Sequence, residues 1–406
     1  MSRLTRDPEL DQLVRSINEK GEEAVGRVGE PAPQGVPHSW PPAEVPSGNP
    51  MEALLLEMAR LGASDLLIMA GAQPIYRVGG RLVRAEGAPF GADELHGIFA
   101  NLLTTRVRER MDSDGAADFS LRLRRPATDE DRRAWRFRVN LHRQRGTLAA
   151  AIRSLPSTVP SLNDLLLPSA LADLVKPASG LVLVCGPTGA GKSTTLGALV
   201  GEINRTAQKH IITIEDPIEY EHRNGESVIE QIEIGRDAPS FAAALRAALR
   251  QDPDVILVGE MRDLDTVATA LTAAETGHLI LSTLHTGDAV QAIHRIIDVF
   301  PPSQQTQIRH QLAMSLNAIV SQQLMIRSDG KGRVVAVEVL LANLPVRNHI
   351  RTDKLQNLTS EITLGKRQGM IALEDSLARL VRQGMISVDD ARVRSRRPDE
   401  LESLLR

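Results

Sequence analysis

The stretch that decides the fold reads Gly186-Pro187-Thr188-Gly189-Ala190-Gly191-Lys192-Ser193. It matches the pattern G-x-x-x-x-G-K-[ST], in which glycines let the backbone curl so that successive N–H groups point at one phosphate. The apolar run 181–185 before it is typical of a buried parallel strand, and the apolar spacing over 192–204 is typical of a helix. A strand, a glycine-rich loop and a helix in this order place a helix N-terminus beneath a phosphate.

This context predicts a nucleotide site made by the loop and by Thr194, the residue that follows it. We expect Lys192 to reach the β- and γ-phosphates of ATP, and we expect the Ser193 hydroxyl to bind Mg²⁺. The alternative is a glycine-rich turn that binds nothing, which the flanking strand and helix disfavour.

Composition narrows the class of protein. The chain has 406 residues, of which 42% are apolar and 24% are charged, so two or three globular domains are expected. A net charge of −3 favours neither nucleic acid nor an anionic membrane surface as a partner. The polar N-terminus and the lack of a long apolar run predict neither a secretory signal nor a membrane span. Cys185 is the only cysteine, which excludes an intramolecular disulfide and fits the reducing cytoplasm.

The sequence predicts four successive parts. Residues 1–50 read as a flexible extension, with a charged helix followed by a proline-rich linker. Residues 51–155 are expected to form a small α/β domain, and residues 156–179 a connection. From 180 to 406, apolar strands alternate with helical stretches, which indicates a parallel sheet covered by helices.

Within the small domain the expected elements alternate in type. They are a helix at 51–61, a strand at 65–69, a hairpin at 75–83, a helix at 92–111, and strands at 117–123, 135–142 and 147–154. A charged loop at 124–133 separates the first two of these last strands.

Acidic residues follow two of the predicted parallel strands. Ligands of open parallel sheets bind beyond the carboxyl ends of the strands, so these positions are site candidates. Glu260, after the run 255–258, is expected to polarise the attacking water; the alternative is a solvated glutamate at a strand end. Glu215, after the run 211–214, could orient water or Mg²⁺ ligands, or could cap the following turn. We favour a catalytic role for Glu215 and leave Asp216 and Glu219 open.

Two histidines bracket the third strand. His285 follows it and is expected to sense the γ-phosphate, whereas His278 precedes it and can equally be a core histidine. One histidine at each end of a strand is poor geometry for a shared metal ion. Gly259 stands where many such proteins have a metal-binding aspartate, so Ser193 and waters are expected to hold most of the Mg²⁺.

Arginines of the small domain are the remaining candidates. Arg136, Arg138 and Arg153 could supply the positive charge that stabilises the transition state of phosphoryl transfer, from a neighbouring subunit. The alternative is that they are surface arginines of an amphipathic sheet. The arginines at 392–397 are expected to be a solvated helix end.

Four motifs now resemble those of one family, the PilT-type secretion ATPases, the twitching-motility motors of type IV pili. They are the Walker A loop 186–193, residues 213–219 (TIEDPIE), which resemble the Asp box, residues 250–263 (RQDPDVILVGEMRD), which resemble the Walker B region, and residues 276–286, which resemble the His box. The segments 63–66 (ASDL) and 136–140 (RFRVN) are similar to the PAS-like domain of the family. The resemblance covers residues 51–395.

The resemblance implies a PAS-like N-terminal domain followed by a RecA-like ATPase domain with a helical C-terminus. It also implies a cytoplasmic homohexamer that binds ATP between these two domains and docks on an inner-membrane platform protein. In that arrangement Glu260 is the catalytic carboxylate, and arginines near Arg136, Arg138 and Arg153 complete the site.

Two features favour the retraction branch of the family. Extension motors and type II secretion ATPases usually carry a four-cysteine zinc element, and this chain has one cysteine. Residues 345–352 (PVRNHIRT) resemble the retraction signature A-I-R-N-L-I-R-E, although His349 and Thr352 depart from it. We therefore expect a motor that disassembles pili. The alternatives are an accessory retraction paralogue or structural coupler, and another secretion or assembly ATPase.

Overall fold

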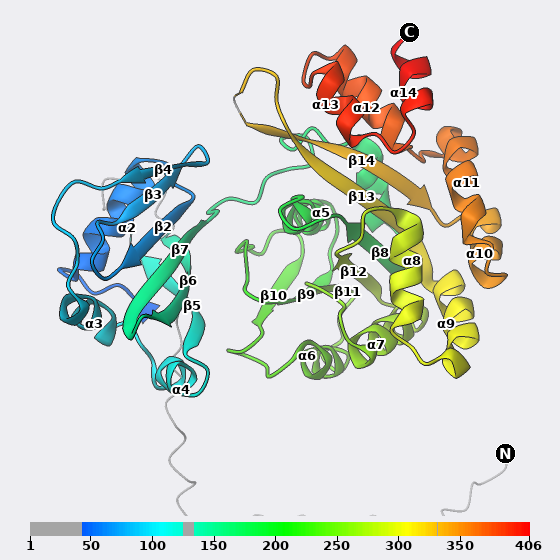
Figure 1. Ribbon diagram of the computed structural model, residues 1–406. Coiled ribbons are helices and arrows are strands. Elements are labelled where there is room, and N and C mark those ends of the chain that lie inside the picture. Colours follow the sequence, from blue (N-terminus) through cyan, green and yellow to red (C-terminus); the bar gives the residue numbers. More distant parts are fainter. Residues whose placement is uncertain (1–42, 125–133, 331) are drawn as a thin grey trace, which may run out of the picture. The chain divides into compact units, whose positions relative to one another are not determined.

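The computed structural model describes residues 43–124, 134–330 and 332–406. The predicted charged helix, nearly all of the extension 1–50 and nearly all of the loop 124–133 lie outside the described residues. The described part contains two seven-stranded sheets, each with its own helices (Figure 1).

The first sheet is formed by the N-terminal half of the described chain. Its strands are, in spatial order, β1 (Ala43–Glu44), β5 (Ala116–Leu123), β6 (Trp135–Gln144), β7 (Thr147–Leu155), β2 (Asp65–Met69), β3 (Ile75–Val78) and β4 (Arg81–Arg84). From β5 to β4 all neighbouring strands are antiparallel. Its helices are α2 (Pro50–Arg60), α3 (Ala92–Ala100) and α4 (Thr105–Ser113).

Alternation along β6 shows why this sheet has a buried and a partly open face. Phe137, Val139 and Leu141 are fully buried, whereas Arg138 and Asn140 between them are only partly buried. The strands and the hairpin predicted for this region are confirmed. The single helix predicted at 92–111 is wrong, because Thr104 starts a second helix by accepting a hydrogen bond from the N–H of Val107.

The second sheet carries the glycine-rich loop. Its strands are, in spatial order, β10 (Val228–Glu233), β9 (His210–Glu215), β11 (Val255–Val258), β12 (Leu279–Leu284), β8 (Gly180–Cys185), β13 (Leu316–Ile326) and β14 (Arg333–Leu341). All neighbours are parallel except the hairpin of β13 and β14. This is the parallel sheet that the sequence predicts.

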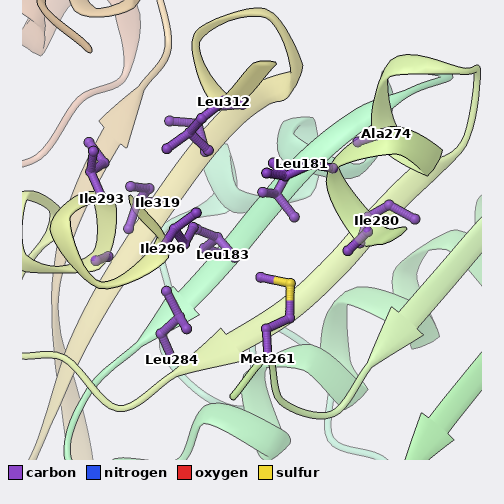
Figure 2. Packing of buried hydrophobic residues seen from close by; sticks show 14 of the residues in the cluster. Leu181, Leu183, Met261, Ala274, Ile280, Leu284, Ile293, Ile296, Leu312 and Ile319 are labelled. Carbon is purple, nitrogen blue, oxygen red and sulfur yellow. The ribbon is translucent and has the colours of Figure 1, made fainter. Parts of the chain in front are cut away.

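Helices cover both faces of the second sheet. One face packs against α5 (Lys192–Thr206). The other face packs against α6 (Phe241–Ala248), α7 (Leu264–Glu275), α8 (Ala289–Asp298), α9 (Pro302–Ser315), α10 (Leu344–Arg351) and α11 (Leu358–Leu364). Strand β8 is buried on both sides because Leu181 and Leu183 face the second group, as Figure 2 shows, while Val182 and Val184 face α5. The packing is therefore three-layered, and β8 lies inside it.

Two further helical segments pack against the second sheet. A 3₁₀ helix at Ser169–Val175, within the predicted connection, packs Leu171 and Leu174 into the core beside α5. At the other end of the chain, α12 (Leu373–Arg382), α13 (Val388–Arg394) and α14 (Pro398–Leu405) pack on the β13–β14 hairpin. The division of the chain into domains stays a prediction.

The prediction of a solvated arginine cluster at the C-terminus is wrong for two of its members. Arg396 pairs with Glu338 of β14, and Arg397 pairs with Glu374 of α12, which is 1% exposed. The sequence suggested one helix end for all four arginines. In the structure α13 ends at Arg394, so Arg396 and Arg397 lie beyond it, where the chain turns back onto the sheet.

Cys185 is a free, buried thiol, as predicted, and burial raises its pKa to about 12. Among the described residues, no helix combines the length and the apolar character needed to cross a membrane.

Candidate active site

The glycine-rich loop runs from the end of β8 to the start of α5, and two glycines make its path possible. At Gly186 a Cβ atom would lie 2.5 Å from the carbonyl oxygen of Gln322, so a larger residue does not fit. Gly191 adopts the left-handed conformation, with φ of 87°, directly before the first residue of α5. The loop therefore packs on β13 beneath it and delivers the chain into the helix.

The start of α5 provides an anion site. No side chain caps this helix, so its first N–H groups are available to a phosphate. The Lys192 ammonium donates to the carbonyls of Gly186 (2.9 Å) and Pro187 (3.1 Å), which places its charge inside the loop. Burial lowers the pKa of Lys192. These are the donors that the phosphates of a nucleotide require, and Ser193 lies beside them in the first helical turn.

Glu260 and His285 follow neighbouring parallel strands, β11 and β12, and the sheet brings them together. The Glu260 Oε2 and His285 Nε2 atoms are 3.8 Å apart, and His285 Nδ1 lies 3.5 Å from Lys192 Nζ. Glu260 also pairs with Arg262 at 2.7 Å. Two residues predicted from strand ends thus lie next to the loop lysine.

The protonation of both groups responds to this setting. Burial raises the pKa of Glu260, and the positive charges of Arg262 and Lys192 oppose the rise. Burial lowers the pKa of His285, and Lys192 and Arg262 lower it further. A carboxylate with a raised pKa beside an uncharged imidazole suits proton transfer from water.

Glu215 ends β9, on the far side of β11 from His285. Its carboxylate accepts hydrogen bonds from the Thr213 hydroxyl (2.7 Å), the Gln231 amide (3.3 Å) and the Glu219 N–H (3.4 Å). Burial nevertheless raises the pKa of Glu215 to about 7. Gly259 allows the approach of the two strand ends, since a Cβ there would lie 3.2 Å from the carbonyl oxygen of Ile214.

Metal binding needs oxygen ligands, and these are present. The Ser193 hydroxyl and the strand-end carboxylates fit Mg²⁺, which keeps several waters and uses few protein ligands. Within the described ranges, no group of three or more His, Cys, Asp or Glu side chains forms a metal cage. His278 binds the carbonyl of Ala273 through Nδ1, which agrees with the alternative of a structural histidine.

Sequence reasoning missed the residues that support the glycine-rich loop and the neighbouring 285–288 loop. In β13, Gln322 donates to the carbonyl of Ala190 at 2.6 Å, and Ser321 donates to the carbonyl of Gly287 at 2.6 Å. Tyr220 donates to the Thr194 hydroxyl at 3.1 Å and packs against Gly197. The available signals were the polar run 321–323 inside the mostly apolar strand β13, and Gly197 inside α5.

The three predicted arginines lie in the first sheet and differ in their surroundings. Arg136 is buried and donates to the carbonyls of Ile218 (2.6 Å) and Glu219 (3.2 Å), next to Glu215 in the chain. Burial, together with the charge of Arg122, lowers the pKa of Arg136 to about 10. Arg138 and Arg153 occupy opposite positions on β6 and β7, and their side chains are 42% and 69% exposed.

Carboxylates of their own sheet hold the two exposed arginines. Arg138 pairs with Asp118 at 3.5 Å, and Arg153 pairs with Asp65 at 2.9 Å. The structure therefore brings Glu260, His285 and Lys192 together, anchors Arg136 on the segment after Glu215, and leaves Arg138 and Arg153 on the face of the first sheet.

The segment that resembles the retraction signature forms α10. Val346 and Ile350 are fully buried in the core. Arg347 donates to the carbonyls of Ala313 and Met314, both at 2.6 Å, and so caps the C-terminal end of α9. Arg351 bonds Asn348 within α10. These contacts agree with a local structural role for Val346, Ile350 and Arg347.

A phosphate-binding loop on a parallel sheet, with a glutamate and a histidine at the ends of neighbouring strands, defines the class: a RecA-like P-loop ATPase. Residues 161–343 match the family described as "Type II/IV secretion system protein". The chain is 43% identical to a "Twitching motility protein" of Neisseria gonorrhoeae over 81% of its own length and 86% of the relative. It is 41% identical to the "Type IV pilus retractation ATPase PilT" of Pseudomonas aeruginosa over 85% of its length and 98% of the relative.

A solved structure gives the same answer. The crystal structure titled "Crystal Structure of the Pilus Retraction Motor PilT and Bound ADP" superposes with a TM-score of 0.78 at 43% identity. The match covers 87% of this chain and 99% of that one. The chain belongs to the PilT-type secretion ATPases, and it is an ATPase that uses a nucleotide. The resemblance seen in the sequence and the predicted fold class are confirmed.

Proposed function

We propose that this protein is the motor that retracts type IV pili, and that it couples ATP hydrolysis to removal of pilin subunits. The observation that carries the proposal is the convergence of Lys192, Glu260 and His285 at the ends of adjacent strands. These three side chains are those that an active ATPase needs at its phosphate site. The chain also resembles retraction motors over more than four-fifths of its length.

The residues divide the chemistry among them. The first N–H groups of α5 and Lys192 hold the phosphates, with the other residues of the loop and Thr194 around them. Glu260 accepts a proton from the attacking water, and His285 lies where it can respond to the γ-phosphate. Glu215 is the second candidate for the base, since its pKa of about 7 suits that task. Ser193, together with waters, would hold Mg²⁺, which would supply positive charge against the phosphates.

The proposed assembly is a homohexameric ring on the cytoplasmic face of the inner membrane, docked there on a platform protein. In the ring, Arg138 and Arg153 of one subunit reach the nucleotide held by the next subunit. The exposure of both arginine side chains supports this role, because a solvent-exposed ion pair such as that of Arg138 with Asp118 costs little to break, and Arg153 itself is 69% exposed although its partner Asp65 is partly buried. Arg136 contributes by holding the segment after Glu215 in place.

Two other functions fit parts of the chain. An accessory ring subunit would bind nucleotide and act as a structural coupler, but the complete set of Lys192, Ser193 and Glu260 favours turnover. Another secretion or assembly ATPase would share the site, but the single cysteine and the α10 segment favour retraction.

The test is genetic and enzymatic together. A twitching-negative strain that lacks its own retraction ATPase is complemented with the wild-type chain or with Glu260→Gln, and ATP turnover of the purified proteins is measured in parallel. We expect the wild type to restore motility and to hydrolyse ATP, and the variant to do neither. Turnover without restored motility would favour a different secretion machine, and motility without turnover would favour the coupler.

A further inference from the structure

The loop between β12 and α8, residues 285–288, is hydrogen-bonded by Arg396 near the C-terminal end of the chain. Its first residue is His285, which lies beside Lys192 and Glu260. The carbonyl of Gly287 accepts a hydrogen bond from Ser321 and a second one from the guanidinium of Arg396. Arg396 is 109 residues away in sequence, so the C-terminal segment directly fixes a catalytic loop.

Arg396 holds this loop from two sides. Its Nη1 atom lies 3.2 Å from the Glu338 carboxylate and 3.7 Å from Asp288, the residue that caps α8. Glu338 in turn accepts a hydrogen bond from the N–H of Ala289, the first residue of α8, at 3.0 Å. Burial raises the pKa of Glu338, and Arg396 opposes the rise. One guanidinium thus joins the loop carbonyl to the start of the next helix.

A buried carboxylate sets the position of Arg396 itself. Glu374 of α12 accepts hydrogen bonds from the backbone N–H groups of Arg396 and Arg397, both at 3.1 Å, and from the Arg397 side chain at 2.7 Å. The reach of Arg396 therefore depends on how α12 and the turn between α13 and α14 pack on β13 and β14.

A cavity lies at this junction. It has a volume of about 370 Å³, and its lining includes Pro187 of the glycine-rich loop, His285, Gly287 and Arg396. The phosphate-binding loop, the histidine loop and the C-terminal segment thus line one open pocket. A shift of the C-terminal helices would therefore move Gly287 through its hydrogen bond with Arg396, and would displace His285, two residues earlier in the same loop.

We propose that Arg396 is a positioning residue for ATP hydrolysis, which holds the 285–288 loop so that His285 stays against Lys192 and Glu260. Turnover then depends on the packing of the C-terminal helices, and any partner that moves them adjusts the rate. A charge-assisted hydrogen bond to a carbonyl gives such a contact both strength and direction. The proposal rests on the ATPase activity of the chain and is independent of whether the pilus is its target.

The first test compares Arg396→Ala with Arg392→Ala in the full-length protein. Arg392 lies on α13 and pairs with Asp389 and Glu402, so its loss removes the same charge without touching the loop. We expect Arg396→Ala to lower kcat by about tenfold or more, since small misplacements of catalytic groups have effects of this size. ADP affinity should stay close to wild type, because the phosphate donors of α5 are intact. Wild-type kcat in Arg396→Ala would overturn the proposal.

A second variant separates positioning from stability. Arg396→Ala leaves the buried Glu338 carboxylate without its counter-charge, which alone could lower the melting temperature. In Arg396→Ala with Glu338→Gln that penalty is removed, while the glutamine can still accept from Ala289. We expect the double variant to regain thermal stability but not kcat. Recovery of both together would show that Arg396 only balances the charge of Glu338, and would refute the positioning role.

Hydrogen exchange gives a readout that does not need turnover. The backbone N–H groups of the 285–289 segment should exchange faster in Arg396→Ala than in Arg392→Ala or in wild type. Unchanged exchange there would contradict the proposal even if kcat fell. Faster exchange in a chain that failed to retract pili would leave this inference standing and the proposed function refuted.

Discussion

The two sheets place their charged side chains by different rules. In the second sheet, Glu215 ends a parallel strand, Glu260 and His285 each follow one, and the strands β9, β11 and β12 are neighbours. Parallel topology alone therefore carries them to one edge. In the first sheet, antiparallel register sets Arg138 opposite Arg153, and Arg153 opposite Asp65, in a row across the face. The parallel strand order of the second sheet therefore gathers its charged residues into a site within one chain. The antiparallel register of the first sheet arranges its charged residues along a surface.

This difference has an energetic counterpart. The strand-end groups are partly buried, and burial shifts the pKa of both glutamates upward. The arginines in the row are exposed and bind carboxylates that solvent also reaches, so each pair adds little to stability. Substitutions in the first group should thus change chemistry within the subunit, and substitutions in the second should act only in an assembly.

The largest effects are expected at the loop and at the strand ends. Lys192→Ala should abolish hydrolysis and weaken ATP binding, because the phosphates lose their main point charge. Glu260→Gln should keep ATP binding and lower kcat by roughly 10²–10⁴, the range for loss of a general base. Steady-state turnover and nucleotide titration measure both.

Glu230→Gln is the matched control for these variants, since Glu230 is an exposed glutamate on the edge strand β10 of the same sheet. It should leave kcat unchanged. If Glu260→Gln turned over at the control rate, the role of the base would pass to Glu215.

The arginine row should give the next largest effect, and only in the ring. Arg138→Ala or Arg153→Ala should lower kcat by about 10² or more at concentrations where the proposed hexamer forms, with an unchanged melting temperature, because a finger arginine stabilises transition-state charge. Arg143→Ala removes an exposed arginine from β6, the strand of Arg138, where it pairs with Asp112, and serves as the control. Equal turnover of all three variants would mean that the row is only a solvated surface.

Arg136→Ala should behave differently from its neighbours. Its guanidinium is buried and bonded to two carbonyls of the segment after Glu215, so its loss leaves these acceptors unpaired. We expect a lower melting temperature together with lower turnover, and thermal unfolding and steady-state turnover of the variant measure both.

The sequence predicted the strand-end site because three local signals coincide there: an apolar run, a polar residue after it, and the glycine-rich loop. It could not predict the support beneath the glycine-rich loop, since Gln322 lies on β13, 132 residues from Ala190, whose carbonyl it binds. Nor could it predict Arg396, because its partners Glu338 and Gly287 come from other parts of the chain. Pairing at such separation depends on tertiary packing, which leaves no local period.

The next prediction concerns how the stability of the folded protein depends on pH through Glu215. The pKa of Glu215 is raised to about 7 in the folded protein from 4.5 in an unfolded chain, so the folded state binds the extra proton between these values. Stability should therefore fall as pH rises from about 4.5 to about 7, and Glu215→Gln should remove that slope, which corresponds to about 3 kcal/mol. Melting temperatures over this pH range measure it. A slope that persists in Glu215→Gln would assign it to another group, such as Glu233, whose pKa burial also raises.

The smallest effect on ATPase activity is expected at α10, which packs on the face of the second sheet that α6, α7, α8, α9 and α11 also cover. Arg347→Ala removes the cap of α9 and should lower stability by about 1.5–3 kcal/mol, the scale of hydrogen bonds from a charged donor. Arg351→Ala removes only a bond to Asn348 on the surface and should leave stability unchanged.

The double variant should retain most of its turnover and its hexamer, yet fail to restore twitching in the complementation assay. Comparing the two single variants then locates the cause. If Arg351→Ala alone abolishes motility, the exposed side of α10 contacts a partner; if only Arg347→Ala does, the defect comes from the end of α9. Motility in the double variant would refute the retraction interpretation of this segment and would favour the accessory or assembly alternatives.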